Sequence, residues 1–391
     1  MNYILFDGPV RTALLPFTFT RPVADIRIGI LTIREKWEKY LGYTTTTITE
    51  EYLMEKFPMV EMEKNVLINS AYLPNEVLAE MVMALEENQA IFSGDEVIAF
   101  YTVDTQEEVD FDTYEIIDYD EAALKIEHVW DIFKKNDAAL REDFELLTEG
   151  RTSQPIPASV NTIAPHNIFI EEGAKLEFVT LNASTGPIYI GKNAEIMEAS
   201  VIRGPFALCE GAVVKMATKV YGATTVGPEC RIGGEVSNSV LFGYSNKGHD
   251  GFLGNSVLGE WCNLGADTNN SNLKNNYDEV KLWDYEKTGF VKTGLQFCGL
   301  FMGDHSKSGI NTMFNTGTVV GVCANIFGSG FPRNFVPSFS WGGAAGMVTY
   351  DVKKAFETAR IVMSRRDVEF TEIDEAILAE VYQQTEKLRN I

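Results

Sequence analysis

The sequence contains few of the residues on which disulfide scaffolds and metal centres are built. Its 391 residues include five cysteines and four histidines. The cysteine count is odd and no two cysteines form a Cys-x-x-Cys pair, so we predict buried free thiols and a cytoplasmic location. No two histidines are closely spaced, so a zinc centre of three histidines is not expected. We therefore predict no metal ligands among these residues.

Long apolar runs and excess positive charge are also absent. No stretch of about 18 apolar residues occurs, which argues against a membrane-spanning helix. The first seven residues have neither a basic segment nor a long apolar one, and they predict a strand instead of a signal peptide. Lys and Arg number 33 against 56 Asp and Glu, giving a formal net charge of -23. Such a surface repels nucleic acid and anionic lipid, so we expect neither as a partner, and an anionic sugar phosphate would need a locally basic pocket.

The first half of the chain alternates between strand and helix patterns. Strands are predicted at Tyr3–Phe6, Thr44–Thr49 and Val66–Asn69, helices over Ile26–Leu41 and from a cap at Asn75 to about Glu87, and a hairpin over Ala90–Val103. This order predicts an α/β domain of Rossmann-like type with a largely parallel sheet at residues 1–118. The charged helical pattern that follows is interpreted as a connecting helix and linker over 119–158.

The second half has a six-residue period. Every sixth residue is aliphatic over eight successive positions: Ile190, Ile196, Ile202, Leu208, Val214, Val220, Val226 and Ile232. This period fits neither a helix nor an ordinary strand, but it is typical of a parallel β-helix with three flat faces, which we place at 159–346. The stretch Asn269–Gly294 breaks the period and predicts a projecting loop. Residues 347–391 are predicted to be a helical tail whose last helix begins at Thr371.

The residues from 246 to 272 carry the clearest chemical signal. They contain His249, then Phe252-Leu253-Gly254, then Asn263-Leu264-Gly265-Ala266-Asp267-Thr268 and Asn272. This segment resembles the acetyltransferase site of the bifunctional UDP-N-acetylglucosamine pyrophosphorylase/glucosamine-1-phosphate N-acetyltransferase family. That site has His, two residues, Tyr-Leu-Gly, followed by Asn-Ile-Gly-Ala-Gly-Thr and Cys-Asn-Tyr-Asp. The resemblance implies a left-handed β-helix, a homotrimer, acetyl-CoA as acyl donor and an amino-sugar 1-phosphate as acceptor.

Carried over by position, His249 takes the place of the general base. An amine that attacks a thioester must lose a proton, and an imidazole is a natural acceptor near neutral pH. Lys247, Phe252, Asn263 and Asn272 take substrate-binding positions. Phe252 stands where the family has tyrosine, so one hydroxyl contact is missing.

The segment Arg11–Pro22 resembles the signature of sugar-1-phosphate nucleotidyltransferases, whose glycine-rich loop is followed by Arg and Pro-Leu-Thr-x-x-x-Pro-Lys. Such a loop turns backbone N–H groups toward a triphosphate. The nucleotide-binding candidates are Gly8, Arg11, Thr18 and Arg21. The sequence departs from the family in having Val23 in place of the lysine and Ser70 in place of the aspartate that holds Mg²⁺. The resemblance therefore implies Mg²⁺ only if this domain is active.

Three functions remain open on the sequence alone. The first is acyl transfer from coenzyme A to an amino-sugar 1-phosphate, with or without nucleotidyl transfer by the N-terminal domain. The second is nucleotidyl transfer that forms a UDP- or dTDP-sugar from a nucleoside triphosphate, with a structural or regulatory β-helix. The third is a non-catalytic sugar-nucleotide-binding protein. The sugar, the acyl group and the nucleotide are not determined by the sequence.

Overall fold

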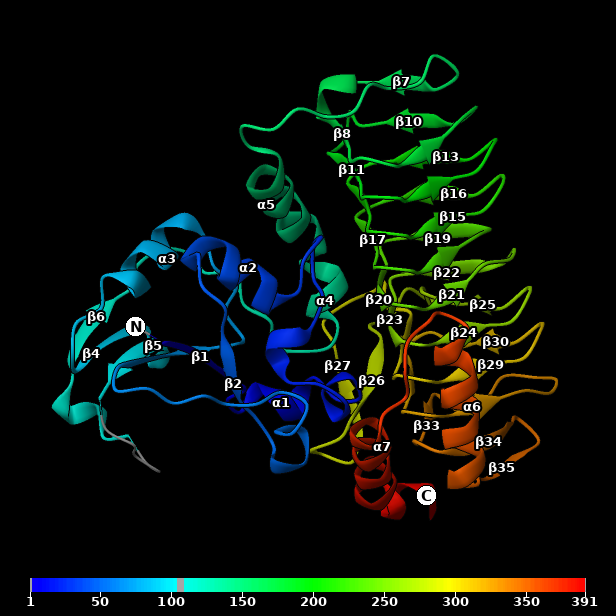
Figure 1. Ribbon diagram of the computed structural model, residues 1–391. Coiled ribbons are helices and arrows are strands. Elements are labelled where there is room, and N and C mark those ends of the chain that lie inside the picture. The colour runs from blue at the N-terminus through cyan, green and yellow to red at the C-terminus, as the bar shows by residue number, and fades with distance from the viewer. Residues whose placement is uncertain (1, 104–108, 391) are drawn as a thin grey trace.

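The computed structural model describes residues 2–103 and 109–390. The chain forms a mixed α/β sheet beside a long three-faced solenoid (Figure 1). Two helices at the C-terminus pack along the lower coils of the solenoid (Figure 1). The predicted fold class, an α/β domain followed by a left-handed parallel β-helix and a helical tail, is confirmed.

The N-terminal sheet has six strands in the order β2-β1-β3-β5-β4-β6. Its strands are β1 (Asn2–Phe6), β2 (Thr46–Ile48), β3 (Asn65–Asn69), β4 (Gln89–Ser93), β5 (Glu96–Thr102) and β6 (Glu115–Asp118). Strand β1 pairs in parallel with β2 and β3, and β4 pairs in parallel with β6. Strand β5 is antiparallel to both β3 and β4. The sheet is thus mixed instead of largely parallel, because the predicted hairpin supplies its central antiparallel strand.

The helices of this domain are α1 (Val10–Ala13), α2 (Ile33–Leu41) and α3 (Glu76–Met83). Helix α2 starts seven residues later than the periodicity of Ile26–Leu41 predicts. Its first turn is fixed by a capping box between Thr32 and Glu35, and Gly29 before it has a φ of +75° that ends any helix. The cap at Asn75 is confirmed, since its side chain accepts a hydrogen bond from the N–H of Leu78. Helix α3 stops at Met83, short of the predicted end.

The segment expected to be a connecting helix is helical only at α4 (Asp131–Lys134) and α5 (Asn136–Thr148). This segment is more than a linker, because one side of α5 is buried. Asn136 is fully buried, and its amide donates to Ala223 O (3.1 Å) and Thr225 Oγ1 (3.1 Å) of the solenoid. Asp143 is buried with Lys36 as its ion-pair partner. The helix pair therefore contacts both the α/β domain and the solenoid, and does more than connect them along the chain.

Three sheets form the solenoid, and we name them the free face, the N-domain face and the tail face. Their strands pair in parallel, except that the last strand of the tail face, β35, is antiparallel to β34. The free face contains β7 (Asn161–Ile163), β10 (Thr180–Asn182), β13 (Val201–Arg203), β16 (Lys219–Tyr221), β19 (Glu235–Ser237) and β22 (Phe252–Gly254), continued by the pair β25 (Asn269–Asn270) and β30 (Met313–Phe314). The N-domain face contains β8 (Ile168–Ile170), β11 (Ile188–Ile190), β14 (Phe206–Leu208), β17 (Thr224–Val226), β20 (Val240–Gly243), β23 (Val257–Glu260), β28 (Leu300–Met302), β31 (Thr318–Val320) and β33 (Phe335–Val336). The tail face contains β9 (Lys175–Leu176), β12 (Glu195–Ile196), β15 (Val213–Val214), β18 (Arg231–Ile232), β21 (Asn246–Lys247), β24 (Asn263–Leu264), β29 (Lys307–Ser308), β32 (Asn325–Ile326), β34 (Ser340–Gly343) and β35 (Gly346–Thr349).

The residues of the six-residue period point into the solenoid and form one continuous apolar core. The interruption predicted at Asn269–Gly294 is a hairpin of β26 (Lys281–Asp284) and β27 (Gly289–Lys292), although Asn269 and Asn270 still belong to a coil. The five cysteines are buried and free, as predicted.

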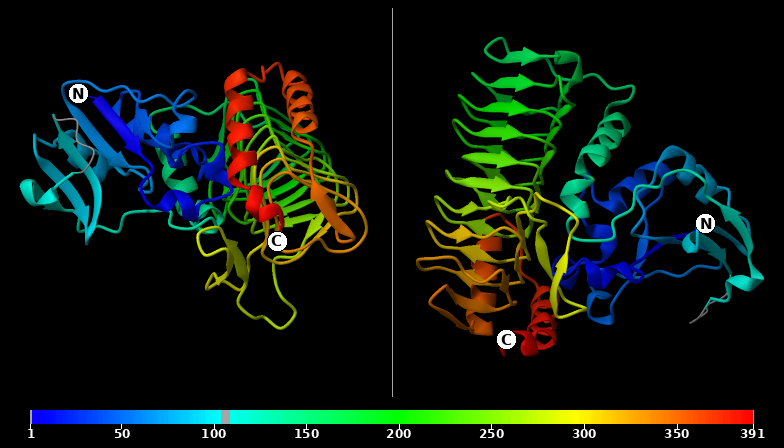
Figure 2. Two further views of the ribbon diagram at one scale, coloured as in Figure 1. Left: turned by 90° about the horizontal axis from the view of Figure 1, so that it is seen from below. Right: turned by 180° about the vertical axis from the view of Figure 1, so that it is seen from behind.

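The α/β sheet and the N-domain face share a single apolar core. Phe17 packs on Phe242 with ring centroids 5.1 Å apart, and Phe133 packs on Phe301 at 6.1 Å. The two further views show the N-terminal domain lying along one side of the solenoid (Figure 2). Because burial of apolar area is the main stabilising term in folding, the two parts are expected to stabilise each other.

Helices α6 (Val352–Ser364) and α7 (Glu372–Gln384) form the tail. The predicted start of the last helix at Thr371 is confirmed, and Thr371 caps this helix through a capping box with Asp374. Ala355, Phe356 and Ala359 of α6 pack in one cluster with Cys323 and Phe339 of the last coils. Within the described residues, no helix is both long and apolar enough to cross a membrane.

Candidate functional site

His249 lies at the corner where the chain passes from the tail face to the free face. It is exposed, within the four residues 248–251 between β21 and β22. The corresponding four-residue corners elsewhere place their third residue in the left-handed region, for example Ala217 (φ +57°) and Asp267 (φ +56°). At the His249 corner the left-handed residue is instead Gly251, the fourth (φ +113°). The backbone at His249 therefore differs from the repeat around it.

Glycine makes this corner possible. A Cβ atom on Gly251 would lie 2.2 Å from Thr268 O of the next coil. The preceding corner has only two residues, Gly233 and Gly234, between β18 and β19. A Cβ on Gly233 would lie 2.7 Å from Gly248 O. The preceding coil therefore stacks closely on the His249 corner through its backbone. Because its corner consists of glycines, no side chain from that coil crowds the imidazole.

Lys247 occupies an inward position of the solenoid core, where its neighbours in the tail face are Ile232 and Leu264. The side chain is 2% exposed, and its ammonium group donates to Gly233 O (3.2 Å) and His249 O (2.5 Å). Burial lowers the pKa of Lys247 to about 8, against the opposing effect of Asp250 and Asp267. Lys247 thus holds the backbone of the His249 corner from inside and does not face the surface on which a substrate would lie.

The other predicted acyl-transfer residues are distributed over two faces. A Cβ on Gly254 would meet both Phe252 Cζ (2.4 Å) and Asn272 Nδ2 (2.8 Å), so Phe252 and Asn272 approach each other on the free face. The amide of Asn272 also donates to Asn255 Oδ1 (2.8 Å). Asn263 is exposed on the tail face, on the other side of the His249 corner. The structure thus places Phe252 and Asn272 together on the free face, His249 at the corner that leads into this face, and Asn263 on the tail face.

The predicted nucleotide-binding residues lie near the carboxyl ends of β1, β2 and β3. Strand β1 has β2 on one side and β3 on the other, so the strand order reverses there, which is where open α/β sheets bind ligands. Arg11 pairs with Asp7 (3.2 Å) and donates to Tyr52 Oη (2.9 Å). Thr18 is buried and donates to Arg11 O (2.7 Å), while Gly8 adopts a left-handed φ of +61°.

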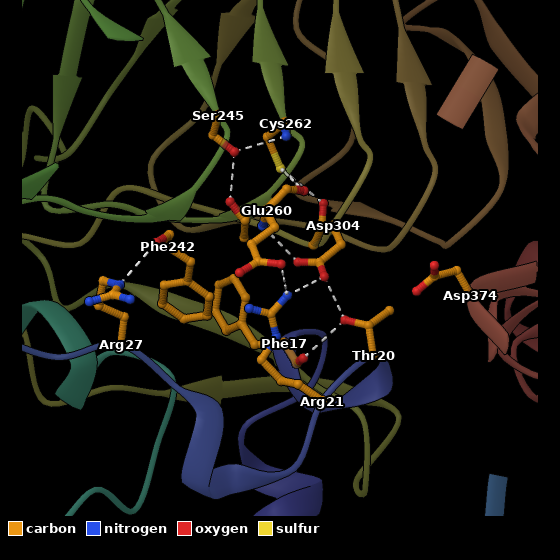
Figure 3. Close-up of polar contacts among 12 residues, drawn as sticks. Phe17, Thr20, Arg21, Arg27, Phe242, Ser245, Glu260, Cys262, Asp304 and Asp374 are labelled. Carbon is orange, nitrogen blue, oxygen red and sulfur yellow. Dashed lines mark hydrogen bonds and ion pairs between the residues drawn. The ribbon is translucent and has the colours of Figure 1, made fainter. Parts of the chain in front are cut away.

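Arg21 is placed elsewhere, against the solenoid. It is buried and forms an ion pair with Asp304, with Glu260 Oε2 at 3.5 Å. Asp304 also accepts hydrogen bonds from Thr20 Oγ1 (2.7 Å) and from the N–H of Glu260 (2.8 Å) (Figure 3). The charge of Arg21 is therefore already neutralised inside the protein. Sequence reasoning missed Asp304, because an acidic residue in a solenoid corner gives no local signal of a partner 283 residues away.

The residues at the sheet edge do not fit a magnesium site. Asp7 is the buried carboxylate there, and its two oxygens accept from Val23 N (2.6 Å), Thr49 Oγ1 (2.6 Å) and Arg11. Burial raises the pKa of Asp7 above its usual range. Magnesium needs several oxygen ligands around it, and the described residues contain no cluster of three acidic, histidine or cysteine side chains suited to a metal.

Comparison with known proteins supports both halves of the sequence interpretation. Residues 3–152 match the family described as sugar nucleotidyl transferase. The bifunctional protein GlmU of Cyanothece sp. is 29% identical over 194 residues, which are 43% of this chain and 42% of that protein. A bifunctional sugar-1-phosphate nucleotidylyltransferase/acetyltransferase of Sulfurisphaera tokodaii is 34% identical over 93 residues, or 24% of this chain and 23% of that protein.

Among solved structures, a hexapeptide transferase family protein from Anaplasma phagocytophilum has 14% identity and a TM-score of 0.25, covering 59% of this chain and 91% of that one. The chain spans less than half the length of the GlmU proteins that it matches. Taken together, the sugar nucleotidyl transferase match over residues 3–152 and the GlmU relatives give this chain a GlmU-like family resemblance.

Proposed function

We propose that this protein transfers an acyl group, most simply acetyl, from coenzyme A to the amine of an amino-sugar 1-phosphate, with His249 as general base. The observation that carries the proposal is the His249 corner. It combines an exposed imidazole, a two-glycine neighbouring corner without side chains, and a backbone anchored from within by Lys247. The names of GlmU and of the Sulfurisphaera tokodaii nucleotidylyltransferase/acetyltransferase agree with this chemistry.

In this reaction the amine nitrogen attacks the thioester carbon and the carbon–sulfur bond breaks, so coenzyme A leaves as a thiolate. The attacking amine must lose a proton, and His249 accepts it. On the free face, which begins after the His249 corner, Asn272 offers an amide donor and Phe252 an apolar surface. No charged side chain other than His249 needs to change its protonation state.

The free face is the expected contact surface of a homotrimer. Its outward side chains include Ile163, Val201 and Tyr221, which are 53%, 50% and 41% exposed. A second copy on this face would cover these apolar side chains and enclose His249. Light scattering of the purified protein tests the trimer directly.

The decisive experiment measures thiol release from acetyl-CoA in the presence of glucosamine 1-phosphate and of other amino sugars. The wild-type protein is compared with His249→Ala and with His166→Ala, an exposed histidine of the first coil that serves as the matched control. Release that disappears only in His249→Ala supports the proposal. Wild-type protein that releases no thiol with any acceptor contradicts it.

A second function, sugar-1-phosphate nucleotidyl transfer by the N-terminal domain, is favoured by the family match over residues 3–152 and by the polar sheet edge around Arg11. There Arg11 would contact a phosphate, and Gly8 would allow close approach of the backbone. The test is pyrophosphate release from UTP or dTTP with a sugar 1-phosphate and Mg²⁺. Activity that depends on Arg11 supports this function. Sugar-nucleotide binding without turnover would instead support the non-catalytic alternative.

A further inference from the structure

A cavity lies at the C-terminal end of the solenoid, away from the His249 corner. It has a volume of about 920 Å³ and is enclosed by the hairpin β26–β27, the turn between β34 and β35, and Arg389 near the chain end. Seen from below, the yellow hairpin and the orange strands flank the end of the solenoid where the chain terminates (Figure 2, left). None of the residues that line the cavity belongs to the segment 246–272.

The charge around this cavity is opposite in sign to the net charge of the whole protein. Its described lining residues include Lys274, Lys281, Arg333 and Arg389 but no aspartate or glutamate. The chain as a whole has 56 acidic against 33 basic residues. Lys281 forms no ion pair with any described residue, so its charge is not neutralised by the protein. A concave surface with this charge pattern attracts an anion despite the negative net charge.

One wall of the cavity is aromatic. Trp283 stacks on Phe335 with ring centroids 4.1 Å apart and planes inclined by 7°, and Phe290 meets Trp283 edge-on at 5.5 Å. The indole N–H of Trp283 is buried and has no hydrogen-bond partner among the described residues. Phe290 is 48% exposed, so its ring is the part of this aromatic wall that a ligand can reach.

From these observations we infer that the cavity binds a phosphorylated nucleoside. Four cations suit phosphate groups, and flat aromatic side chains suit a base. A volume of about 920 Å³ lies at the upper end of small-molecule sites and is much larger than a single phosphate needs. The same chemistry occurs in a nucleoside diphosphate sugar and in the phosphoadenosine portion of coenzyme A, so the test must separate these two sources. The inference does not depend on the function proposed for His249.

The experiment is isothermal titration of the full chain with UDP, with adenosine 3′,5′-bisphosphate and with inorganic phosphate. The double variant Lys281→Glu/Arg333→Glu places repulsive charges in the cavity, and Phe290→Ala removes an exposed ring without opening the core. Lys287→Glu reverses one positive charge in the turn of the same hairpin, outside the lining, and is the control for charge reversal near the cavity.

We expect at least one of the two nucleotides to bind, with affinity reduced about tenfold or more in the double variant and retained in the control. Phe290→Ala should weaken nucleotide binding but not phosphate binding. UDP alone identifies a sugar-nucleotide site, whereas the bisphosphate alone identifies a coenzyme A site. Absence of nucleotide binding, equal binding of inorganic phosphate, or binding unchanged by the double variant would overturn the inference. His249→Ala should leave this binding intact, which separates it from the acyl-transfer proposal.

Discussion

Lys247 provides the sharpest test of the solenoid geometry. Its side chain takes a core position that is aliphatic in most coils, and replacing it by methionine keeps an unbranched chain of similar length there. Burial lowers the pKa of Lys247 from 10.5 to about 8 in the folded state. At neutral pH the folded protein must therefore hold a buried charge, at a cost of about 3 kcal/mol relative to the unfolded chain.

The stability of the protein depends on pH because the folded and unfolded chains bind the Lys247 proton with different affinity. Between about pH 8 and 10.5 the unfolded chain keeps the proton of Lys247 while the folded chain has released it. Stability therefore rises with pH across this window, and the cost is fully present below it. From pH 7 to 9.5 the cost decreases by about 2 kcal/mol. We expect the stability advantage of Lys247→Met over the wild type to shrink by that amount.

The assay is urea unfolding of both proteins at about pH 7, 8.5 and 9.5, followed by circular dichroism. Other groups titrate in the same range, but their contributions cancel in the difference between variant and wild type. Lys219→Met, on the exposed free face, is the control and should show no such trend. A difference between Lys247→Met and wild type that stays constant with pH would refute the placement of Lys247 in the core.

Further predictions concern the corner, the domain contact and the buried groups. Gly251→Ala should lower the free energy of unfolding by about 1–3 kcal/mol and abolish the proposed acyl transfer, because a Cβ at this left-handed φ clashes with the next coil. Gly248→Ala has open space and should be tolerated. Thermal melting and thiol release measure both effects. Arg21→Met should destabilise the protein by about 3–5 kcal/mol because it leaves the buried Asp304 without its ion-pair partner. The double variant Arg21→Met/Asp304→Asn should recover much of this loss. An unchanged melting temperature of Arg21→Met would contradict the buried pair. Burial lowers the pKa of His305 to about 3, so the stability of the folded protein should fall as the pH drops below 6.5. His305→Asn should reduce this acid sensitivity, since asparagine tolerates the φ of +60° at this position. Urea unfolding at pH 7 and pH 5 measures the difference. Burial raises the pKa values of the five cysteine thiols, so a thiol reagent should label them only after unfolding, and rapid labelling of the native protein would count against their burial.

Local and periodic features of the fold were predictable from the sequence. The six-residue period identified the solenoid because each inward position recurs at a fixed spacing along the chain. The cap at Asn75 and the helix start at Thr371 were predictable because capping depends on residues three positions apart. The start of helix α2 was not predictable from apolar spacing alone, since the decisive signal was the capping box at Thr32.

What only the tertiary structure decided concerns residues far apart in the chain. The motif placed Arg21 among nucleotide-binding candidates, but folding pairs it with Asp304. Folding also buries one side of α5, which the sequence indicated only as a connecting helix. It also put Lys247 in the core and gathered four cations and an aromatic wall into one cavity. A sequence determines what each segment prefers to form. Which charges meet, and which remain unpaired, depends on how the coils and the sheet stack, and that is fixed only when the apolar surfaces of both halves are buried together.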